Sequence, residues 1–343
     1  MAKKKEKSGS LGVFFLNEEK RKKLILPTVV LSACLFALVF VETGIAFVNI
    51  QNFLEIRSLA SLSVIEKGKS GLGEMTVIET KTVGTGQPYR NWRKDGFPVN
   101  SKAVLVYDLT TGKVLLDYNA KEVLPMASVT KLMSMVVIED NRAIFGDNEW
   151  LQFTLEDIEI EGKKNIFAIG EEYGIDSLIA AALISSSNEA TSLLARSVSS
   201  ATGNDFVKMM QEKARVIGLE ETRFSNPIGF DGDHFSTTRD IAALLEWILG
   251  NRPELLEKST LLQTTIRSRT EKEVLIRNTN YMILGEFHGI VGSKTGYTDL
   301  AQGCMALVKK IENDLVVFVI LGSENRTTEM RSLINWTESA YGF

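Results

Sequence analysis

Ser128-Val129-Thr130-Lys131 stands directly ahead of the largely apolar stretch 132–137. This pattern predicts a helix over 129–140 with Ser128 at its start, where the helix N-terminus stabilises developing negative charge. Lys131 follows Ser128 by three residues, so its amine lies on the same helix face, within reach of the hydroxyl. If burial lowers the pKa of Lys131, its neutral amine can accept the serine proton. Alone, the pattern also fits an N-cap serine followed by a surface lysine.

Two further strings carry polar groups that fit an acyl-transfer site. Ser185-Ser186-Ser187-Asn188 interrupts apolar helical segments, and its hydroxyl and carboxamide can relay a proton and hold an amide. Lys294-Thr295-Gly296 joins a cation and a hydroxyl that can bind a carboxylate to a glycine that lets another backbone approach. The strand around it can offer its edge to an extended peptide. Together the three strings supply acyl transfer without histidine.

Composition excludes several other classes of protein. The net charge is -4, and residues 1–23 hold eight Lys/Arg against three Glu, so the remaining 320 residues carry -9 and no basic nucleic-acid surface is expected. Two cysteines, Cys34 and Cys304, are too few for a disulfide framework or a cysteine-rich zinc site. The chain has two histidines but no G-x-S-x-G string, which argues against a Ser-His-Asp hydrolase. Ser63 stands where a Walker A sequence needs its first glycine, which argues against a nucleotide-binding P-loop.

The N-terminal part predicts a membrane anchor. Residues 24–41 contain no charge and directly follow Lys20-Arg21-Lys22-Lys23, as in a membrane-spanning helix with a cytoplasmic N-terminus. A cleaved signal peptide and a buried core helix are the alternatives; no A-x-A-like cleavage site follows. We therefore expect a basic cytoplasmic tail over 1–23, an anchor over 24–48, a stalk and lead-in over 49–98, and a globular domain over 99–343.

The globular part predicts an α+β fold. Strand patterns occur at 103–108 and 113–118 and return at 305–308 and 315–321. Helical patterns lie between them, at 129–140, 177–198, 204–217 and 238–249, and a last one covers 327–341. This order predicts one antiparallel sheet built from both ends of the domain, with a helical region inserted in the middle.

The order of the three strings, with 58 residues from Ser128 to Ser186 and 108 from Ser186 to Lys294, matches the set S-x-x-K, S-D-N and K-T-G. On these residues the chain resembles the penicillin-binding D-alanyl-D-alanine carboxypeptidases, serine peptidases of the S11 type. The resemblance covers about 99–343 and implies a β-lactamase/DD-peptidase-like fold. It extends to Tyr107-Asp108, Tyr118-Asn119-Ala120, Met126-Ala127-Ser128, Phe224-Ser225-Asn226-Pro227-Ile228-Gly229, Asn278-Thr279-Asn280 and Gly292-Ser293-Lys294-Thr295-Gly296-Tyr297-Thr298.

The resemblance implies a role for each matched residue. Ser128 is the expected nucleophile, Lys131 its general base and Ser186 the relay of a proton to the leaving amine. The implied binding residues are Asn188 for the donor peptide, Lys294, Thr295 and Gly296 for the terminal carboxylate, and the backbone amides of Ser128 and Tyr297 for the oxyanion. Two positions depart from the family pattern without removing a functional group: Met126 replaces a common proline, and Ser187 a common glycine.

The implied substrate is the D-Ala-D-Ala end of a peptidoglycan stem peptide, with water as acyl acceptor and β-lactams as covalent inhibitors. No metal or organic cofactor is expected, and nucleic acid is not an expected partner. With the anchor, the resemblance places the domain outside the cytoplasm, on the membrane of a bacterial cell. Stem-peptide preference and oligomeric state stay open.

Three other functions use the same strings. A D,D-endopeptidase that cuts cross-links needs the same residues. A class A β-lactamase needs a glutamate between the second and third strings; Arg252-Pro253-Glu254 supplies one, but it begins 66 residues after Ser186, and Ser187 replaces the aspartate of S-D-N. A wall-binding protein without catalysis is the third alternative, although every reactive group is present.

Overall fold

The computed structural model describes residues 87–146, 150–230 and 233–343. The chain divides after Glu79, and all described residues belong to the second unit, residues 80–343. The predicted tail, anchor and most of the stalk lie outside the described residues. In the part that the structure describes, no helix is both long and apolar enough to cross a membrane.

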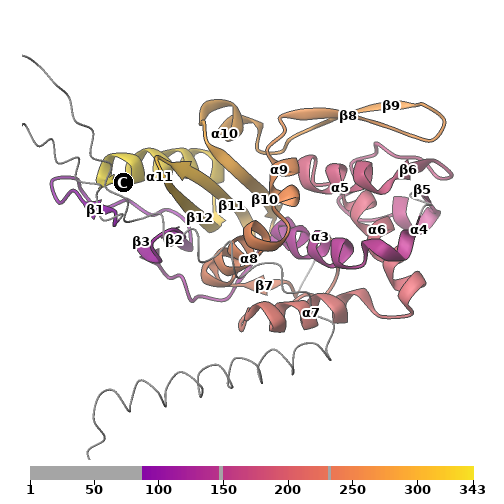
Figure 1. Cartoon of the computed structure of the whole chain (residues 1–343), viewed down its shortest axis with the longest axis horizontal. Helices are drawn as coiled ribbons and strands as arrows, with labels where there is room; N and C mark the ends of the chain where they lie inside the picture. The colour runs from indigo at the N-terminus through magenta and orange to yellow at the C-terminus, as the bar shows by residue number, and fades with distance from the viewer. Residues whose placement is uncertain (1–86, 147–149, 231–232) are drawn as a thin grey trace, which may run out of the picture. The chain divides into compact units, whose positions relative to one another are not determined.

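A five-stranded antiparallel sheet forms the centre of the domain (Figure 1). Its strand order is β10-β11-β12-β2-β3, which leaves β10 at one edge. The strands are β2 (Ala103–Asp108), β3 (Lys113–Tyr118), β10 (Ile290–Thr298), β11 (Gln302–Ile311) and β12 (Asp314–Ser323). Two strands come from the start of the domain and three from its end, which confirms the predicted α+β arrangement.

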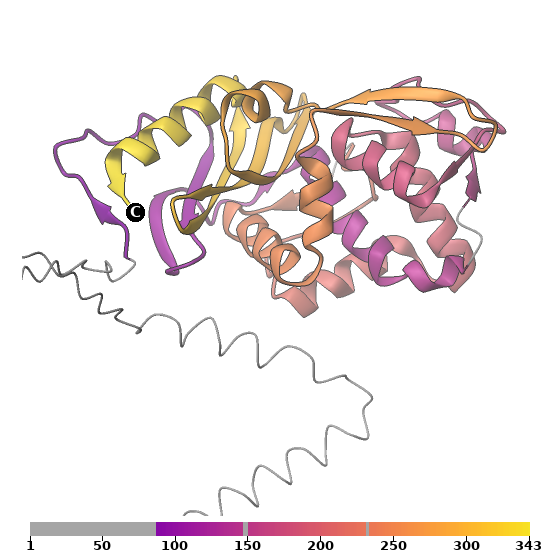
Figure 2. The ribbon, with the colours of Figure 1, turned by 45° about the horizontal axis from the view of Figure 1, so that its top comes forward.

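The two faces of this sheet contribute to two different cores. Because side chains alternate along a strand, Val104 and Val106 of β2 face one core while Ala103 and Leu105 face the other. Helix α11 (Arg326–Ala340) covers the first face, with Leu333 fully buried, and α8 (Thr238–Asn251) packs on the second. Figure 2 shows α11 along one side of the sheet, and the helical region on the other.

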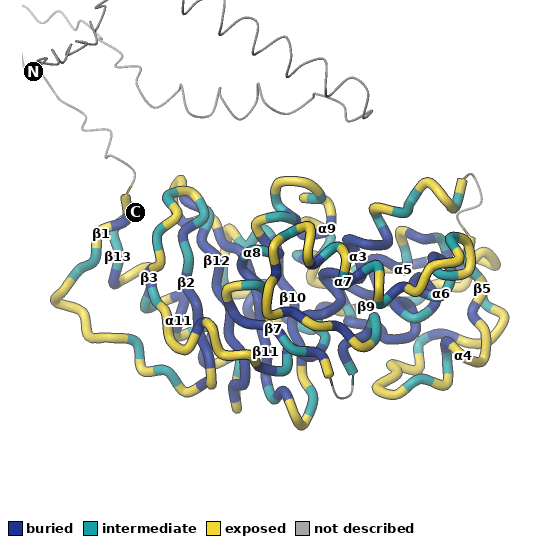
Figure 3. Tube along the Cα trace, turned by 90° about the horizontal axis from the view of Figure 1, so that it is seen from below, coloured by how far each residue is buried: buried dark blue, intermediate teal, exposed yellow. Residues whose placement is uncertain are grey.

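The inserted helical region follows β3 and ends before β10. Its centre is α3 (Lys131–Asp140), which is buried from Lys131 to Ile138 and contacts α5, α6, α7 and α8. Figure 3 shows how this helix and the central strands make up the buried interior. The other helices of the region are α4 (Leu155–Ile158), α5 (Ile175–Ile184), α6 (Asn188–Thr202), α7 (Phe206–Ile217) and α9 (Pro253–Ser259), and α10 (Tyr281–Glu286) precedes β10.

The described part of this region also contains three short two-stranded sheets. They pair β4 (Leu124–Pro125) with β7 (Phe235–Ser236), β5 (Trp150–Gln152) with β6 (Glu172–Gly174), and β8 (Gln263–Arg267) with β9 (Glu273–Arg277). The hairpin of β8 and β9 leads through α10 into β10. Both strands of this hairpin contact α5.

The first and last described strands pair with each other. β1 (Tyr89–Arg90) and β13 (Tyr341–Gly342) are antiparallel, with Tyr89 opposite Gly342. The Arg90 guanidinium lies 5.0 Å from the ring centre of Trp336 and 5.4 Å from that of Tyr341, close enough for cation–π attraction. Residues ahead of Val99 thus contribute to the fold.

Candidate active site

Ser128 lies on a tight turn rather than on the first turn of the predicted α-helix. The 3₁₀ segment Ala127–Thr130 carries it, and α3 begins only at Lys131. Ala127 has a φ of 48°, a left-handed conformation that costs free energy in a residue other than glycine. Gly229 packs against this turn so closely that a Cβ there would lie 2.2 Å from the Ala127 carbonyl oxygen. The surroundings therefore hold the serine in place against local strain.

Lys131 faces Ser128 with its amine, as predicted. Its side chain is fully buried, and Nζ lies 2.9 Å from Ser128 Oγ, 2.7 Å from Asn188 Oδ1 and 2.6 Å from the Ile228 carbonyl oxygen. The last two atoms can only accept hydrogen bonds, so they take two N–H groups of the amine. In a neutral amine the third position is a lone pair, and that position points at the serine hydroxyl.

The surroundings of Lys131 favour this neutral form. Burial lowers the pKa of Lys131 well below its usual value, and the positive charges of Lys294 and Lys164 lower it further. Glu189 acts in the opposite direction. An uncharged lysine within hydrogen-bond distance of a serine hydroxyl has the protonation state and the geometry of a general base.

The second string links the first string to the third. Helix α5 ends at Ile184 and α6 begins at Asn188, so the continuous helix predicted over 177–198 is broken at the functional residues. Ser186 has a φ of 58°, and its Oγ accepts a hydrogen bond from Lys294 Nζ at 2.8 Å. Asn188 accepts one from Lys131, while its Nδ2 donates to the Glu161 carbonyl oxygen at 2.8 Å. In the described structure, Asn188 thus orients the Lys131 amine.

The two departures from the family pattern have local explanations. Ser187 has a φ of -63°, which needs no glycine, and its Oγ accepts from the Ala190 N–H at the start of α6. Met126 is buried, and its N–H donates to the His234 carbonyl oxygen at 3.3 Å, a bond that proline cannot make. Both residues therefore strengthen the backbone around the site.

Lys294 and Thr295 lie on β10, at the edge of the sheet beside the serine turn. Lys294 is buried and also lies 2.8 Å from the Thr295 carbonyl oxygen. Burial, helped by the charges of Lys164 and Arg326, lowers its pKa to about 7. The Thr295 hydroxyl is 2.6 Å from that of Thr279. The pair offers a cation and a hydroxyl to an anionic group at the strand edge.

Gly296 lets β10 approach the serine turn. A Cβ at this position would lie 2.9 Å from the Met126 carbonyl oxygen and 3.0 Å from the Ser128 nitrogen. Only glycine avoids this crowding, which explains the third residue of the string. Next to it, Tyr297 has an exposed side chain.

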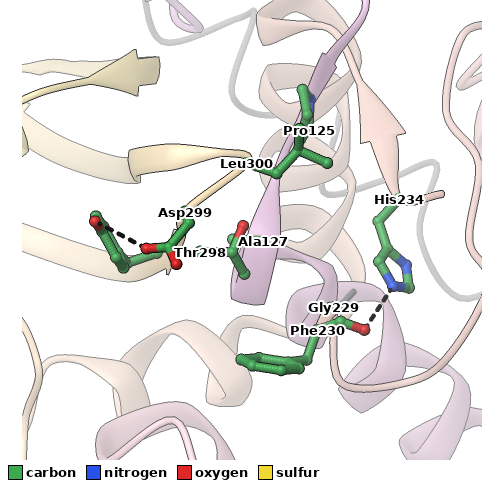
Figure 4. Close-up of a pocket in the computed structure, with 9 residues that line it drawn as sticks. Pro125, Ala127, Gly229, Phe230, His234, Thr298, Asp299 and Leu300 are labelled. Atoms are coloured by element: carbon green, nitrogen blue, oxygen red, sulfur yellow. Dashed lines mark hydrogen bonds between the residues drawn. The ribbon is translucent and has the colours of Figure 1, made fainter. Parts of the chain in front are cut away.

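A cavity of about 360 Å³ opens beside the serine turn (Figure 4). The last residues of β10 and the following turn, from Tyr297 to Leu300, line one side. Gly229, Phe230 and His234 line the other side, and Pro125 and Ala127 complete the lining. In the described ranges, no three His, Cys, Asp or Glu side chains gather as metal ligands.

Comparison with known proteins gives the family. The profile of peptidase family S11, described as D-alanyl-D-alanine carboxypeptidase, matches residues 91–325. The chain belongs to peptidase family S11. A D-alanyl-D-alanine endopeptidase of Pseudomonas aeruginosa is 32% identical to this S11 peptidase, over 78% of the chain and 88% of the relative. A D-alanyl-D-alanine carboxypeptidase of Bacillus subtilis is 28% identical, over 70% of the chain and 63% of the relative.

Solved structures show the same fold. The D-alanyl-D-alanine carboxypeptidase of Francisella tularensis aligns with a TM-score of 0.63 at 22% identity, over 71% of each chain. Penicillin-binding protein D2 of Listeria monocytogenes, in its ampicillin-bound form, aligns with a TM-score of 0.61 at 24% identity, over 72% of this chain and 99% of that one. The described domain of the S11 peptidase thus has the mixed α/β fold of the DD-peptidases.

Glu189 supports the site of this S11 peptidase, although no sequence string singles it out. Its buried carboxylate accepts hydrogen bonds from the backbone N–H groups of Lys164 and Asn165, at 2.5 and 2.9 Å, and from Ser187 Oγ at 2.7 Å. The Glu189 carboxylate therefore links the backbone at Lys164 and Asn165 to the start of α6. The only sequence signal is its position next to Asn188.

Arg326 is a second residue that the sequence strings miss. It begins α11, and its charge lowers the pKa of Lys294. Burial lowers the pKa of Arg326 itself, and its Nε is buried without a hydrogen-bond partner in the described part of the chain. A second cation therefore acts on Lys294. It lies at the start of α11 while Lys294 lies on β10, so no local pattern predicts its effect.

Glu189→Ala is expected to lower the free energy of unfolding by about 2–4 kcal/mol, because it leaves three donors without their acceptor in a buried place. Urea denaturation of the purified protein measures this. Glu212→Ala, which removes an exposed carboxylate from α7, is the matched control and is expected to change the stability by less than about 0.5 kcal/mol. Equal stability of the two variants would contradict the bracing role of Glu189.

Proposed function

We propose that this S11 peptidase hydrolyses the terminal D-Ala–D-Ala bond of peptidoglycan stem peptides through an acyl-enzyme on Ser128. The observation that carries the proposal is the 2.9 Å contact between Lys131 Nζ and Ser128 Oγ, in a site whose other end holds the cation of Lys294. The family match and the relatives named above support the choice of substrate.

In the proposed acylation, each of these groups takes the role that the family resemblance implies. Ser128 Oγ attacks the carbonyl carbon of the penultimate D-Ala while the neutral Lys131 amine takes its proton. The backbone N–H groups of Ser128 and Tyr297 stabilise the resulting oxyanion. As the C–N bond breaks, the proton passes from Lys131 by way of the Ser186 hydroxyl to the leaving amine of D-Ala. Lys131 is then neutral again and can deprotonate the water that releases the shortened peptide.

The edge position of β10 explains how the substrate is held. A peptide can add to this edge as a further antiparallel strand, because β10 pairs within the sheet only with β11 on its other side. Lys294 and Thr295 then bind the C-terminal carboxylate. This binding places the scissile carbonyl over the serine turn, which Gly296 allows to lie close.

A second candidate function is D,D-endopeptidase activity on cross-linked stem peptides. The observation in its favour is the Pseudomonas endopeptidase, which matches 78% of this chain at 32% identity. An Escherichia coli D-alanyl-D-alanine endopeptidase also matches, at 26% identity over 70% of the chain. The acyl donor and the catalytic groups are the same in both reactions, and only the leaving group differs.

The purified protein is expected to release D-Ala from a stem pentapeptide and to take a covalent label from a fluorescent penicillin. Ser128→Ala is expected to abolish both, because the acyl bond forms on this oxygen. Ser185→Ala, which removes a neighbouring hydroxyl bonded to the Ala181 carbonyl, is the control and should keep both.

Labelling without D-Ala release, but with cleavage of a cross-linked dimer, selects the endopeptidase. Rapid turnover of a chromogenic cephalosporin indicates a β-lactamase, and absence of Ser128-dependent labelling indicates a binding protein.

The pH dependence of kcat/KM is expected to be bell-shaped. Activity rises with pH as Lys131 loses its proton, and falls above about pH 7 as the empty site loses the Lys294 ammonium that binds the carboxylate. Bound carboxylate stabilises that ammonium, so kcat should persist to higher pH than kcat/KM. Lys294→Arg, whose charge persists, should lose the alkaline fall. A kcat/KM that is flat between about pH 6 and about pH 9 contradicts these roles.

The anchor over 24–48 belongs to the same proposal, with the globular domain outside the cytoplasm. Its support is the charge-free stretch 24–41 behind four consecutive basic residues. The full chain is expected to stay in the membrane fraction after alkaline carbonate washing and to be cut by protease added to intact spheroplasts. Release by carbonate contradicts the anchor, and protection from protease contradicts the orientation. A cytoplasmic protein serves as the control for spheroplast integrity.

A further inference from the structure

The direction of the bound peptide follows from the proposed function, on which this inference rests. Its C-terminal carboxylate lies at Lys294 and Thr295, and its scissile carbonyl lies at the backbone of Ser128 and Tyr297. The peptide therefore runs antiparallel to β10. The residue that precedes the two D-Ala residues must lie beside the end of β10 and the turn that follows, where the cavity opens.

The walls of this cavity are mostly apolar. Phe230 and Leu300 stand on opposite sides, as Figure 4 shows. The buried His234 ring forms part of the wall, with Nδ1 3.3 Å from the Ser225 nitrogen and Nε2 3.1 Å from Ser225 Oγ and 3.4 Å from the Phe230 carbonyl oxygen. An alkyl chain fits between such walls.

One acidic residue is among those that line this apolar space. Among the nine described residues that line the cavity, Asp299 alone carries a carboxylate. It lies on the exposed turn after β10, and its Oδ1 is 3.5 Å from the Tyr297 hydroxyl. A cavity with apolar walls and one exposed carboxylate among its lining residues fits a side chain with an alkyl stem and a terminal ammonium.

We propose that the cavity receives the side chain of the residue preceding D-Ala-D-Ala, and that Asp299 pairs with a free ω-amino group on that residue. Asp299 is then a specificity-determining residue. It selects donor peptides that carry lysine or another diamino acid whose second amine is unsubstituted. A donor whose ω-amino group is already acylated, as in a cross-link, loses the ion pair and leaves the carboxylate facing a neutral amide.

The test compares two peptides that end in D-Ala-D-Ala and differ in one group, with lysine or Nε-acetyl-lysine as the preceding residue. Wild-type kcat/KM is expected to favour lysine about three- to fivefold, the effect of one partly exposed ion pair. Asp299→Asn should bring this ratio close to one while leaving the acetylated peptide unaffected. Glu312→Gln, an equal change of net charge at the β11–β12 turn, should keep the wild-type ratio.

A binding measurement separates failure of this inference from failure of the proposed function. The dissociation constants of both peptides are measured by calorimetry on Ser128→Ala and on Ser128→Ala/Asp299→Asn, where no turnover occurs. Preference for lysine that disappears with Asp299 supports the inference even if the wild type releases no D-Ala. Equal binding of both peptides, or a preference that survives Asp299→Asn, overturns it. D-Ala release without such a preference leaves the peptidase intact and removes only the role of Asp299.

Discussion

A buried amine that no carboxylate contacts, among the residues that the structure describes, is the constraint on which the rest of this domain depends. The proposed action of Lys131 on Ser128 requires an uncharged amine, and burial beside other cations lowers the pKa of Lys131 in that direction. Burial alone would not orient the lone pair of the Lys131 amine. The carbonyl of Ile228 and the amide oxygen of Asn188 occupy two of its three hydrogen-bonding positions and direct the third at the serine. The segments that carry these groups are far apart in sequence, so the fold must position them accurately relative to one another.

The fold meets this demand by joining a rigid helix to the edge of a rigid sheet. Helix α3 is buried along most of its length, and β10 is fixed by its pairing with β11. The serine turn, which leads into α3, contacts β10, so the helix and the sheet edge each supply one side of the site. Strain is accepted where the chain has to turn its functional groups inward, at Ala127 and Ser186. Glu189 then holds the surrounding segment in place.

The sequence predicts the parts of this site that lie within a short string. Ser128 and Lys131 are three residues apart, so helical geometry alone predicts their contact, and strand patterns at both ends predict the mixed sheet. Local patterns cannot predict the break in the helix at Ser186, because Leu178 to Ile184 and the start of α6 are both good helix formers. They also miss the hairpin of β8 and β9, each of which buries only one side chain. Arg326 and Asp299 gain their importance from tertiary placement.

The pairing of β1 with β13 brings the two ends of the described domain together. Tyr89, near the start of the described domain, lies opposite Gly342, near its end, at the spacing of neighbouring strands, about 5 Å. The described domain is therefore nearly a closed loop. Two residue pairs and one guanidinium among aromatic rings hold its ends together. A short linker would therefore suffice to join them, which is the geometry that circular permutation requires.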